Sequence, residues 1–285
     1  MTTDQMFTRR RLLIGGAAML GAAGTTGTAA LLIGDGGPGT APARATTPAA
    51  GPGTLRALKP SAYRLQPIAG HGPPARRRTL VRAAVRRKPF LRVDGRGRSM
   101  VLTFDDGPDP RYTPDILRIL RDHDVRAMFF VCGEMAVQHQ DLLREMADDG
   151  HVVGNHTWSH PLLTTLSRSR IHSEMARTCE IIDKAYGEPP LWFRAPYGAW
   201  NRTAFQLGAE LGMEPLAWTV DTLDWRTPGA RTIAERVENG AGPGVIVLSH
   251  DAGGDRSQSV RALRDYLPDL LESGYRITVP QRKYT

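Results

Sequence analysis

The chain has 285 residues, of which 41% are hydrophobic and 23% charged, and its formal net charge is +8. This length suffices for one substantial globular domain with extensions. Residues 1–98 contain 17 Lys and Arg against 3 Asp and Glu, whereas residues 99–285 contain 20 against 26. The acidic balance of the larger part disfavours a nucleic-acid-binding domain, which would need a positive surface of its own.

The first 33 residues have the pattern of an export signal. Thr8-Arg-Arg-Arg-Leu-Leu-Ile14 precedes a moderately apolar stretch that is rich in Gly and Ala. The paired arginines indicate a bacterial twin-arginine signal, with a general secretory signal as the alternative. An apolar stretch of about 20 residues also just reaches the length that spans a bilayer. We therefore expect residues 1–33 to act as a cleaved signal or as an anchor, which makes the protein secreted or tethered at the cell surface.

Residues 34–88 are expected to form a flexible linker. Up to about residue 75 they are rich in Gly, Pro, Ala and Thr, and such a segment buries too little apolar surface to offset its ordering entropy. Residues 76–98 then contain ten Lys and Arg against one Asp. On an exported protein, this basic run either contacts anionic lipid headgroups or anionic wall polymers, or is simply a solvated linker.

From Arg98 onward, strand patterns alternate with helical patterns. Strands are expected at 101–104, 127–131, 151–155, 192–193, 215–220, 245–248 and 275–279. Helices are expected at 113–122, 141–147, 171–186, 205–211, 233–239 and 260–272. This alternation predicts an α/β domain over residues 89–285 with a parallel sheet, either open or closed into a barrel.

Titratable side chains follow directly after the predicted strands, and this placement favours a barrel. They are Asp105, Asp106, His156, Arg194, Asp221 and His250. In parallel barrels the catalytic groups gather at the carboxyl ends of the strands, where the connecting loops converge. The sequence therefore predicts one functional site at that end.

Asp106, His156 and His160 form a candidate metal site. One carboxylate and two imidazoles, with a coordination position left open, are typical of hydrolytic zinc. The two histidines are four residues apart, so one helical turn would place both on a single face. Without Asp106 they would be read as a surface pair. We expect Zn2+ first, although other divalent ions suit the same ligands.

Asp105 is the candidate general base. Neighbouring strand residues point to opposite sides, so Asp105 is expected to approach the attacking water rather than to share the metal with Asp106. A second ligand and a turn-capping role are the alternatives. Arg194 can hold Asp105 through a planar, two-pronged contact. His250 follows an apolar strand and is the candidate general acid, because an amide leaves badly as an anion.

Five ordered motifs resemble those of the polysaccharide deacetylases, the NodB-type carbohydrate esterases. They are Thr103-Phe-Asp-Asp-Gly107, His156-Thr-Trp-Ser-His160, Arg194-Ala-Pro-Tyr197, Asp221-Thr-Leu-Asp-Trp225 and Leu248-Ser-His250. The resemblance covers about residues 89–280 and departs from the family at Ala195, where relatives often have Pro. It implies a distorted (β/α) barrel of about seven strands that removes acetyl groups from N-acetylglucosamine units.

The resemblance also implies roles for residues around the proposed metal site. Asp224 or Asp221 would pair with His250, the backbone N–H of Tyr197 would stabilise an oxyanion, and Pro196 would stiffen its loop. Trp225 and Leu248 would line the pocket for the acetyl methyl group. Trp158 and Trp200 are candidates for stacking on sugar rings, with simple packing as the alternative.

The expected function is metal-dependent removal of N-acetyl groups from N-acetylglucosamine-type units of peptidoglycan or chitin-like polymers. The alternatives are an O-deacetylase of the acetylxylan-esterase type and a non-catalytic wall-binding module, which would be expected to lack a ligand or the base. Cys132 and Cys179 either pair after export or stay as buried thiols.

Overall fold

The computed structural model describes residues 83–93 and 97–280 of the chain. The expected export signal at 1–33 and the greater part of the expected linker at 34–88 lie outside the described residues. None of the helices in the described part combines the length and the apolarity that a bilayer crossing requires.

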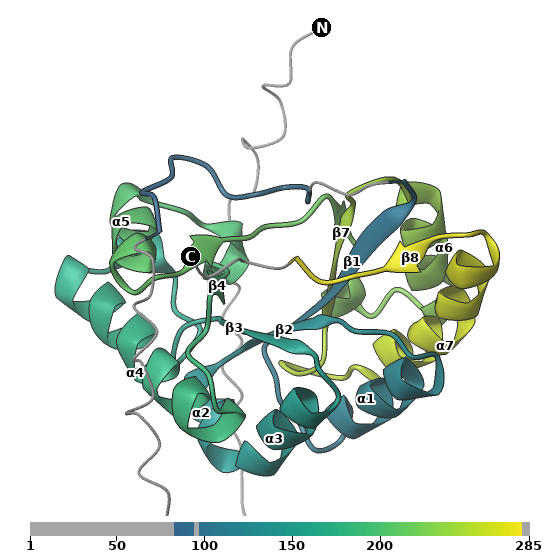
Figure 1. The fold of residues 1–285 in the computed structure, drawn as a ribbon, viewed down its shortest axis with the longest axis horizontal. Coiled ribbons are helices and arrows are strands. Elements are labelled where there is room, and N and C mark those ends of the chain that lie inside the picture. The colour runs from purple at the N-terminus through teal and green to yellow at the C-terminus, as the bar shows by residue number, and fades with distance from the viewer. Residues whose placement is uncertain (1–82, 94–96, 281–285) are drawn as a thin grey trace, which may run out of the picture. The chain divides into compact units, whose positions relative to one another are not determined.

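A parallel sheet of eight strands forms the centre of the described domain (Figure 1). Seven strands follow one another in the order β5-β4-β3-β2-β1-β7-β6, and β8 pairs with the start of β1. The strands are β1 (Ser99–Asp105), β2 (Met128–Val131), β3 (Val152–Asn155), β4 (Trp192–Phe193), β5 (Glu214–Pro215), β6 (Val220–Asp221), β7 (Ile246–His250) and β8 (Arg276–Ile277). The α/β class and the distorted barrel of about seven strands are confirmed.

The helices lie around the outer side of this sheet (Figure 1). They are α1 (Thr113–Asp122), α2 (Gly133–Gln138), α3 (Gln140–Asp148), α4 (Arg168–Tyr186), α5 (Arg202–Glu210), α6 (Ala230–Gly240) and α7 (Ser257–Glu272). Short 3₁₀ turns occupy Leu163–Thr165, Pro196–Gly198 and Asp224–Arg226. The six predicted helices are confirmed, whereas α2 was not predicted, because six residues are too few to show a helical period.

Local signals explain where the longest helix begins and ends. The side chain of Ser167 accepts a hydrogen bond from the Arg170 N–H at the start of α4. At the other end, Gly187 adopts φ 95°, the left-handed conformation that terminates helices and that glycine adopts without strain. The sequence pattern therefore placed the end of α4 correctly at Tyr186.

Side-chain alternation along β1 separates two environments. Met100, Leu102 and Phe104 join the large apolar cluster between the sheet and the helices. Val101 instead packs in a second cluster with residues of β2, β4 and β7. Because the period of a strand is two, Asp105 falls on the same side as Val101, away from the helices.

The predicted strand 215–220 is wrong as a single element. The chain forms two short strands there, and β5 and β6 lie at opposite ends of the sheet order. The backbone N–H of Leu216 donates to Phe193, whereas that of Thr219 donates to Ile246. The segment changes partner within three residues as it crosses from β4 to β7, which an unbroken apolar pattern cannot reveal.

The described residues before β1 pack against this crossing. Phe90 forms a parallel bridge to Leu216, and Arg92 forms an antiparallel bridge to Val245 just before β7. We call residues 90–93 the closing segment, because they pair with the residue that follows β5 and with the residue that precedes β7. Within the expected linker, Ala83 is buried and Arg86 forms an ion pair with Glu214.

Candidate active site

The polar residues at the strand ends converge, as the sequence predicted. Asp105 and His250 are register partners at the ends of the paired strands β1 and β7. His156 follows β3, and its Nε2 lies 3.6 Å from Asp105 Oδ2. Arg194 follows β4 and reaches Asp105 from the other side.

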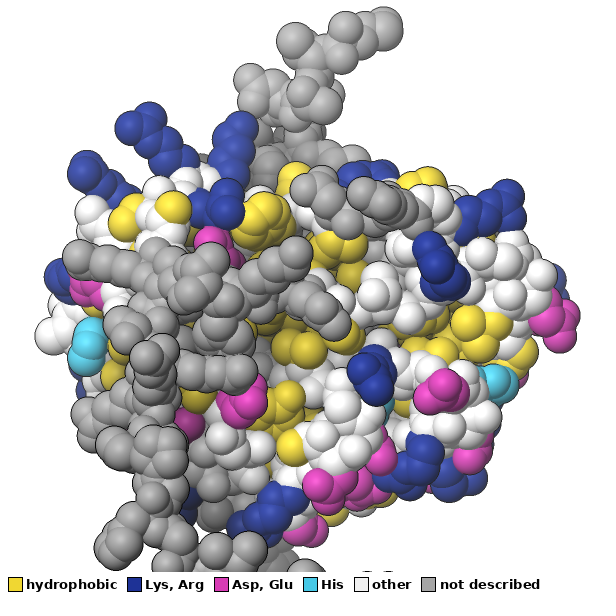
Figure 2. All heavy atoms as spheres, in the orientation of Figure 1, with side chains coloured by type: hydrophobic (Ala, Val, Ile, Leu, Met, Phe, Trp, Pro, Cys, Tyr) yellow, Lys and Arg dark blue, Asp and Glu magenta, His cyan; other side chains and the backbone are white. Residues whose placement is uncertain are grey.

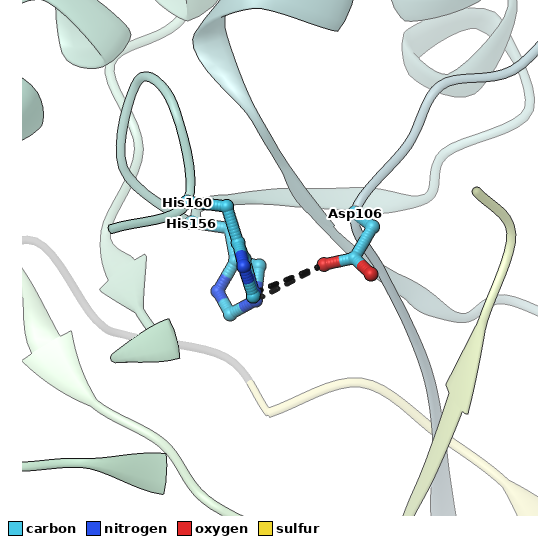
Figure 3. Close-up of side chains that lie close together, drawn as sticks. All are labelled: Asp106, His156 and His160. Carbon is cyan, nitrogen blue, oxygen red and sulfur yellow. Dashed lines mark ion pairs between the residues drawn. The ribbon is translucent and has the colours of Figure 1, made fainter. Parts of the chain in front are cut away.

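Asp106, His156 and His160 form a compact cluster (Figure 3). Asp106 Oδ1 lies 3.5 Å from His156 Nε2 and 3.3 Å from His160 Nε2. One potential ligand atom from each residue lies within 4.8 Å of the others. The three predicted ligands therefore meet at one point.

The chemistry of this cluster fits a divalent metal ion. Asp106 Oδ1 is buried and has no hydrogen-bond partner among the described residues, which is costly for a charged oxygen unless a cation is bound. His156 Nδ1 lies 2.8 Å from the carbonyl oxygen of Arg194. Because a carbonyl only accepts, Nδ1 carries the proton that is donated to Arg194, and Nε2 is the ring nitrogen left to face Asp106 and a metal ion. One carboxylate and two imidazoles are a normal donor set for such an ion.

The electrostatics of the cluster also favour a charged carboxylate. Burial alone would raise the pKa of Asp106, but the hydrogen bond and charge of His156, together with the charges of His250 and His160, outweigh it and the pKa is lowered. Burial, followed by the charge of His156, lowers the pKa of His160. Both shifts favour the deprotonated forms, which are the forms that bind metals.

The two histidines do not lie on a helix, so the expected single helical face is wrong. Residues 156–162 form a loop in which Thr157 and His160 have positive φ values of 71° and 55°. The loop is held from α4 by the buried Glu174. Glu174 Oε2 accepts the N–H groups of Trp158 and Ser159 at 2.9 and 2.8 Å, and Oε1 accepts the Ser159 hydroxyl at 3.0 Å.

The two adjacent carboxylates also differ from the expected alternation. Asp106 has φ 78°, so the strand conformation ends at Asp105 and the chain turns. Both carboxylates then approach the same imidazole, because His156 Nε2 is 3.6 Å from Asp105 Oδ2 and 3.5 Å from Asp106 Oδ1. The left-handed residue brings together two side chains that an extended strand would have separated.

Arg194 holds Asp105 through one nitrogen rather than two. Its Nη1 donates to Asp105 Oδ1 at 2.6 Å and to Thr103 Oγ1 at 2.8 Å. The remaining donors, Nε and Nη2, reach the carbonyl oxygens of Leu216 and Ala217 at 3.1 and 2.9 Å. Arg194 is fully buried. The expected two-pronged contact is therefore wrong, but Asp105 Oδ1 is fixed and Oδ2 is left on the side of His156.

His250 is paired with Asp224, which decides between the two predicted partners. His250 Nδ1 lies 2.6 Å from Asp224 Oδ1, and the His250 backbone N–H and the Ser259 hydroxyl both donate to Asp224 Oδ2. Burial would lower the pKa of His250, but the hydrogen bond and charge of Asp224 outweigh it and raise the pKa to about 9. Asp221 instead accepts the Leu223 N–H at 2.8 Å.

The predicted substrate-binding residues divide into exposed and buried groups. Tyr197 is 67% exposed and packs its ring edge-on against His160, whereas Trp225 is 39% exposed. Pro196 and Leu248 are buried. Tyr197 has φ 60°, which turns the backbone sharply at the proposed oxyanion donor. Two aromatic surfaces thus remain open to solvent in the loops after β4 and β6.

Trp158 and Trp200, the two candidates for stacking on sugar rings, pack within the protein. The ring of Trp158 lies against the main apolar cluster, with the Arg177 guanidinium 3.7 Å from its centroid. Trp200 stacks on Phe205 with ring centroids 5.3 Å apart. Of the two roles predicted for these residues, sugar stacking and simple packing, their contacts in the structure agree with packing.

Sequence reasoning missed two buried acids that support the site. Glu174 anchors the histidine loop, and Asp251 is fully buried beside the Asp105–Asp106 turn. Burial raises the pKa of Asp251 to about 7. The position of Asp251 next to His250 was a usable signal, whereas Glu174 is indistinguishable in sequence from a surface residue of α4. Cys132 and Cys179 are free thiols and do not pair.

Comparison with known proteins agrees with this geometry. The sequence model of the family described as polysaccharide deacetylase matches residues 92–216. The chain is 38% identical over 183 residues to the peptidoglycan-N-acetylglucosamine deacetylase of Bacillus cereus, covering 64% of this chain and 66% of that protein. It is 37% identical over 212 residues to the chitooligosaccharide deacetylase of Rhizobium leguminosarum bv. trifolii, covering 70% of this chain and 99% of that protein.

A solved structure extends the likeness to three dimensions. The Bc1960 peptidoglycan N-acetylglucosamine deacetylase, crystallised in complex with 4-naphthalen-1-yl-N-oxidanyl-benzamide, superposes with a TM-score of 0.64 at 35% identity. That match covers 66% of this chain and 88% of the solved one. Sequence and fold thus agree with the five motifs and with the convergence of their side chains. The chain belongs to the polysaccharide deacetylase family of enzymes.

Proposed function

We propose that this enzyme is a metal-dependent hydrolase that removes N-acetyl groups from N-acetylglucosamine-type units of a cell-wall polysaccharide, either peptidoglycan or a chitin-like polymer. The observation that carries the proposal is one arrangement of side chains. A carboxylate fixed by Arg194 and an imidazole fixed by Asp224 end two paired strands beside the Asp106, His156 and His160 cluster.

The metal would be held by Asp106, His156 and His160, and Zn2+ is the ion that this donor set favours. A bound divalent ion would polarise the acetyl carbonyl and make a water easier to deprotonate. Two features support this assignment: the buried Asp106 Oδ1 has no hydrogen-bond partner among the described residues, and His156 Nδ1 is engaged by Arg194, which leaves Nε2 to face Asp106.

Asp105 and His250 transfer the protons of the reaction, and Arg194 and Asp224 orient them. Asp105 takes a proton from the attacking water at Oδ2, while Arg194 holds Oδ1 and so fixes the carboxylate plane. His250 donates a proton from Nε2 to the departing nitrogen, because Asp224 occupies Nδ1 and keeps the ring charged. A carbon–oxygen bond forms and the carbon–nitrogen bond breaks, which yields acetate and a free amine.

Four further residues would surround the acetyl group that reacts. The backbone N–H of Tyr197 would stabilise negative charge on the carbonyl oxygen, on a loop stiffened by Pro196. Trp225 and Leu248 would enclose the acetyl methyl group. Their support is family membership together with their positions beside the site, in the loops after β4 and β6 and, for Leu248, on β7.

The choice of an N-acetylated substrate rests on the relatives, which are peptidoglycan-N-acetylglucosamine and chitooligosaccharide deacetylases by name. The buried Asp224–His250 pair supports an amide, because an amine leaves only when it is protonated. An ester needs less help from the acid, so an O-deacetylase remains the second candidate.

Acetate release tests the proposal. The purified protein is stripped of metal with a chelator, reloaded with Zn2+, and assayed on N-acetylglucosamine oligomers and on peptidoglycan. We expect release that depends on Zn2+ and leaves a free amine. A free hydroxyl from an acetylated xylan, with no amine product, would assign the O-deacetylase. Zinc binding without release from any substrate would assign a non-catalytic module.

We further propose that the protein is exported by the twin-arginine route and contacts an anionic wall polymer or membrane through residues 76–98. Lys and Arg side chains gather along the upper left of the face in Figure 2, where residues 83–93 run in Figure 1. Arg86 already pairs with Glu214, whereas Arg87 and Lys88 are exposed. This local positive charge supports the contact.

The contact is tested without disturbing the domain by replacing the four arginines at positions 76, 77, 78 and 82 with serine. We expect weaker binding to anionic vesicles and to isolated cell walls, with acetate release from soluble oligomers unchanged. Binding equal to that of the parent protein would rule the contact out.

A further inference from the structure

Asp251 is a buried carboxylate that the chemistry described above does not use. It follows His250 directly and is 1% exposed. Its backbone N–H donates to the carbonyl oxygen of Asp105 at 3.1 Å. Its Oδ1 accepts the backbone N–H of Gly107 at 3.1 Å. Asp251 therefore forms hydrogen bonds to the residues on both sides of Asp106.

A second contact ties the same carboxylate to the start of α1. Thr113 donates its hydroxyl to Asp251 Oδ2 at 2.6 Å, and Thr113 Oγ1 in turn accepts the backbone N–H of Asp109 at 2.8 Å. Both carboxylate oxygens are thus engaged by groups that flank the Gly107–Pro108 turn. The turn is held between α1 and the end of β7.

The fit at this point leaves no room for another atom. A Cβ on Gly107 would lie 2.1–2.4 Å from the carboxylate atoms of Asp251, so only glycine lets the backbone approach this closely. The loop after Asp251 continues the contact, because a Cβ on Gly253 would lie 2.5 Å from Asp106 Oδ2. The close packing fixes the position of the turn to within a fraction of an ångström.

The contacts of Asp251 lie where the strands that carry Asp105 and His250 end. Asp105 and His250 are register partners on β1 and β7, and the next residue of each strand leaves the sheet. Beyond this pair the strand ladder no longer holds the two chains together. The Asp251 contacts to Asp105 and Gly107 extend the pairing of the two chains by one further step.

We propose that Asp251 is a positioning residue that fixes the Asp105–Asp106 turn against the end of β7, and thereby sets the place of the metal ligand Asp106 and the separation of the base from the acid. This inference rests on the proposed function for its effect on turnover. Its effect on metal binding concerns the Asp106, His156 and His160 cluster alone.

The test measures zinc affinity by competition with a chromophoric chelator in the absence of substrate, and then kcat and KM on N-acetylglucosamine oligomers. In Asp251→Ala both carboxylate contacts are lost. We expect zinc binding to weaken by about 10-fold or more, as for other residues that orient metal ligands, and kcat to fall with KM little changed. Asp251→Asn keeps the acceptor for Gly107 and is expected to recover most of the zinc affinity.

Two further variants separate positioning from a general loss of stability. Leu267→Ala opens a cavity in the buried face of α7, away from the turn, and should lower the melting temperature while leaving zinc affinity unchanged. Thr113→Val removes the hydroxyl that donates to Asp251 Oδ2 and accepts the Asp109 N–H, leaves the Gly107 contact intact, and should weaken zinc binding by a smaller factor. If Asp251→Ala does not fold, Thr113→Val carries the test.

The proposal is overturned if Asp251→Ala binds zinc and turns over substrate like the parent protein. It is also overturned if Leu267→Ala weakens zinc binding as much, or if Thr113→Val leaves zinc binding unchanged when Asp251→Ala is unfolded. A parent protein that binds zinc but releases no acetate would contradict the proposed function and leave the zinc measurements to decide the role of Asp251.

Discussion

At the scale of single residues, four carboxylates within one site lie in four different surroundings. Asp105 is paired with a fully buried arginine, and Asp224 with an imidazole. Asp106 Oδ1 lacks a hydrogen-bond partner among the described residues, and Asp251 is engaged by a backbone N–H and a hydroxyl. The pKa of a carboxylate depends on its burial and on the nearest charges. These different surroundings therefore imply different roles for chemically identical groups.

Asp105→Asn tests the role of the base. The amide keeps the size of the side chain but cannot accept the proton of water, so kcat should fall by about 100-fold to 10,000-fold. Zinc affinity should stay close to that of the parent protein, because Asp105 is not one of the three ligands. Turnover within a few-fold of the parent would contradict the assignment, and a matching loss of zinc would make Asp105 a ligand instead.

The Asp224–His250 pair predicts a pH dependence. His250 acts as an acid only while it is protonated, and Asp224 raises its pKa to about 9, so kcat should fall as the pH rises through this region. In Asp224→Asn the negative charge is removed, and the alkaline limb should move toward the ordinary value of 6.5. Profiles of kcat from about pH 6 to about pH 10 would show the shift. An alkaline limb at the same pH in both proteins would exclude His250 as its source.

At the scale of elements, loops rather than helices place the three proposed metal ligands. Asp106, Thr157 and His160 all have positive φ, a conformation that non-glycine residues rarely adopt. Such residues persist when their surroundings hold them. For the histidine loop, the surroundings include Glu174 on α4, which receives three donors from Trp158 and Ser159.

Glu174→Ala should therefore loosen the histidine loop. We expect zinc affinity to fall by about 10-fold, the usual range for a residue that supports a ligand, because His160 is no longer held at its position. Glu180→Ala is the matched control, since Glu180 is an exposed glutamate on the same helix. Equal zinc affinities for the two variants would show that the loop keeps its shape without Glu174.

At the scale of the whole domain, the closing segment connects the two ends of the sheet to the site. Phe90 pairs with Leu216 and accepts the Ala217 N–H at 2.8 Å. The carbonyl oxygens of Leu216 and Ala217 in turn hold the guanidinium of Arg194. A segment that precedes the first strand thus supports the arginine that orients the base.

Phe90→Ala should lower the stability of the domain. The half-buried ring packs edge-on against Trp192, with centroids 6.1 Å apart, and lies under the guanidinium of Arg86 at 3.9 Å. We expect a loss of about 2 kcal/mol, which lowers the melting temperature by about 4–8 °C for a domain of this size. Leu91→Ala is the control, because Leu91 is 56% exposed and should cost little. Equal melting temperatures would show that the closing segment does not stabilise the sheet.

Much of the site could be predicted from the sequence. Alternating strand and helix patterns fix the α/β class, and polar residues at strand ends fix which end carries the site. Asp106, His156 and His160 were predicted as ligands from residue type and spacing, and the structure brings the three side chains together. These inferences succeed because they depend on local periodicity and on a rule that holds for all parallel strands.

The tertiary structure alone decided how these residues are held. It chose Asp224 over Asp221 as the partner of His250, gave Asp105 a single contact to Arg194, and replaced the expected helical turn by a loop. It also split residues 215–220 between two ends of the sheet and brought Glu174 and Asp251 to the site. Each of these outcomes depends on which distant segments meet, and on backbone turns with positive φ. Residue type and spacing show which catalytic and metal-binding side chains the chain contains. Only the tertiary structure decides which hydrogen-bond and ion-pair partners orient those side chains and shift their pKa values.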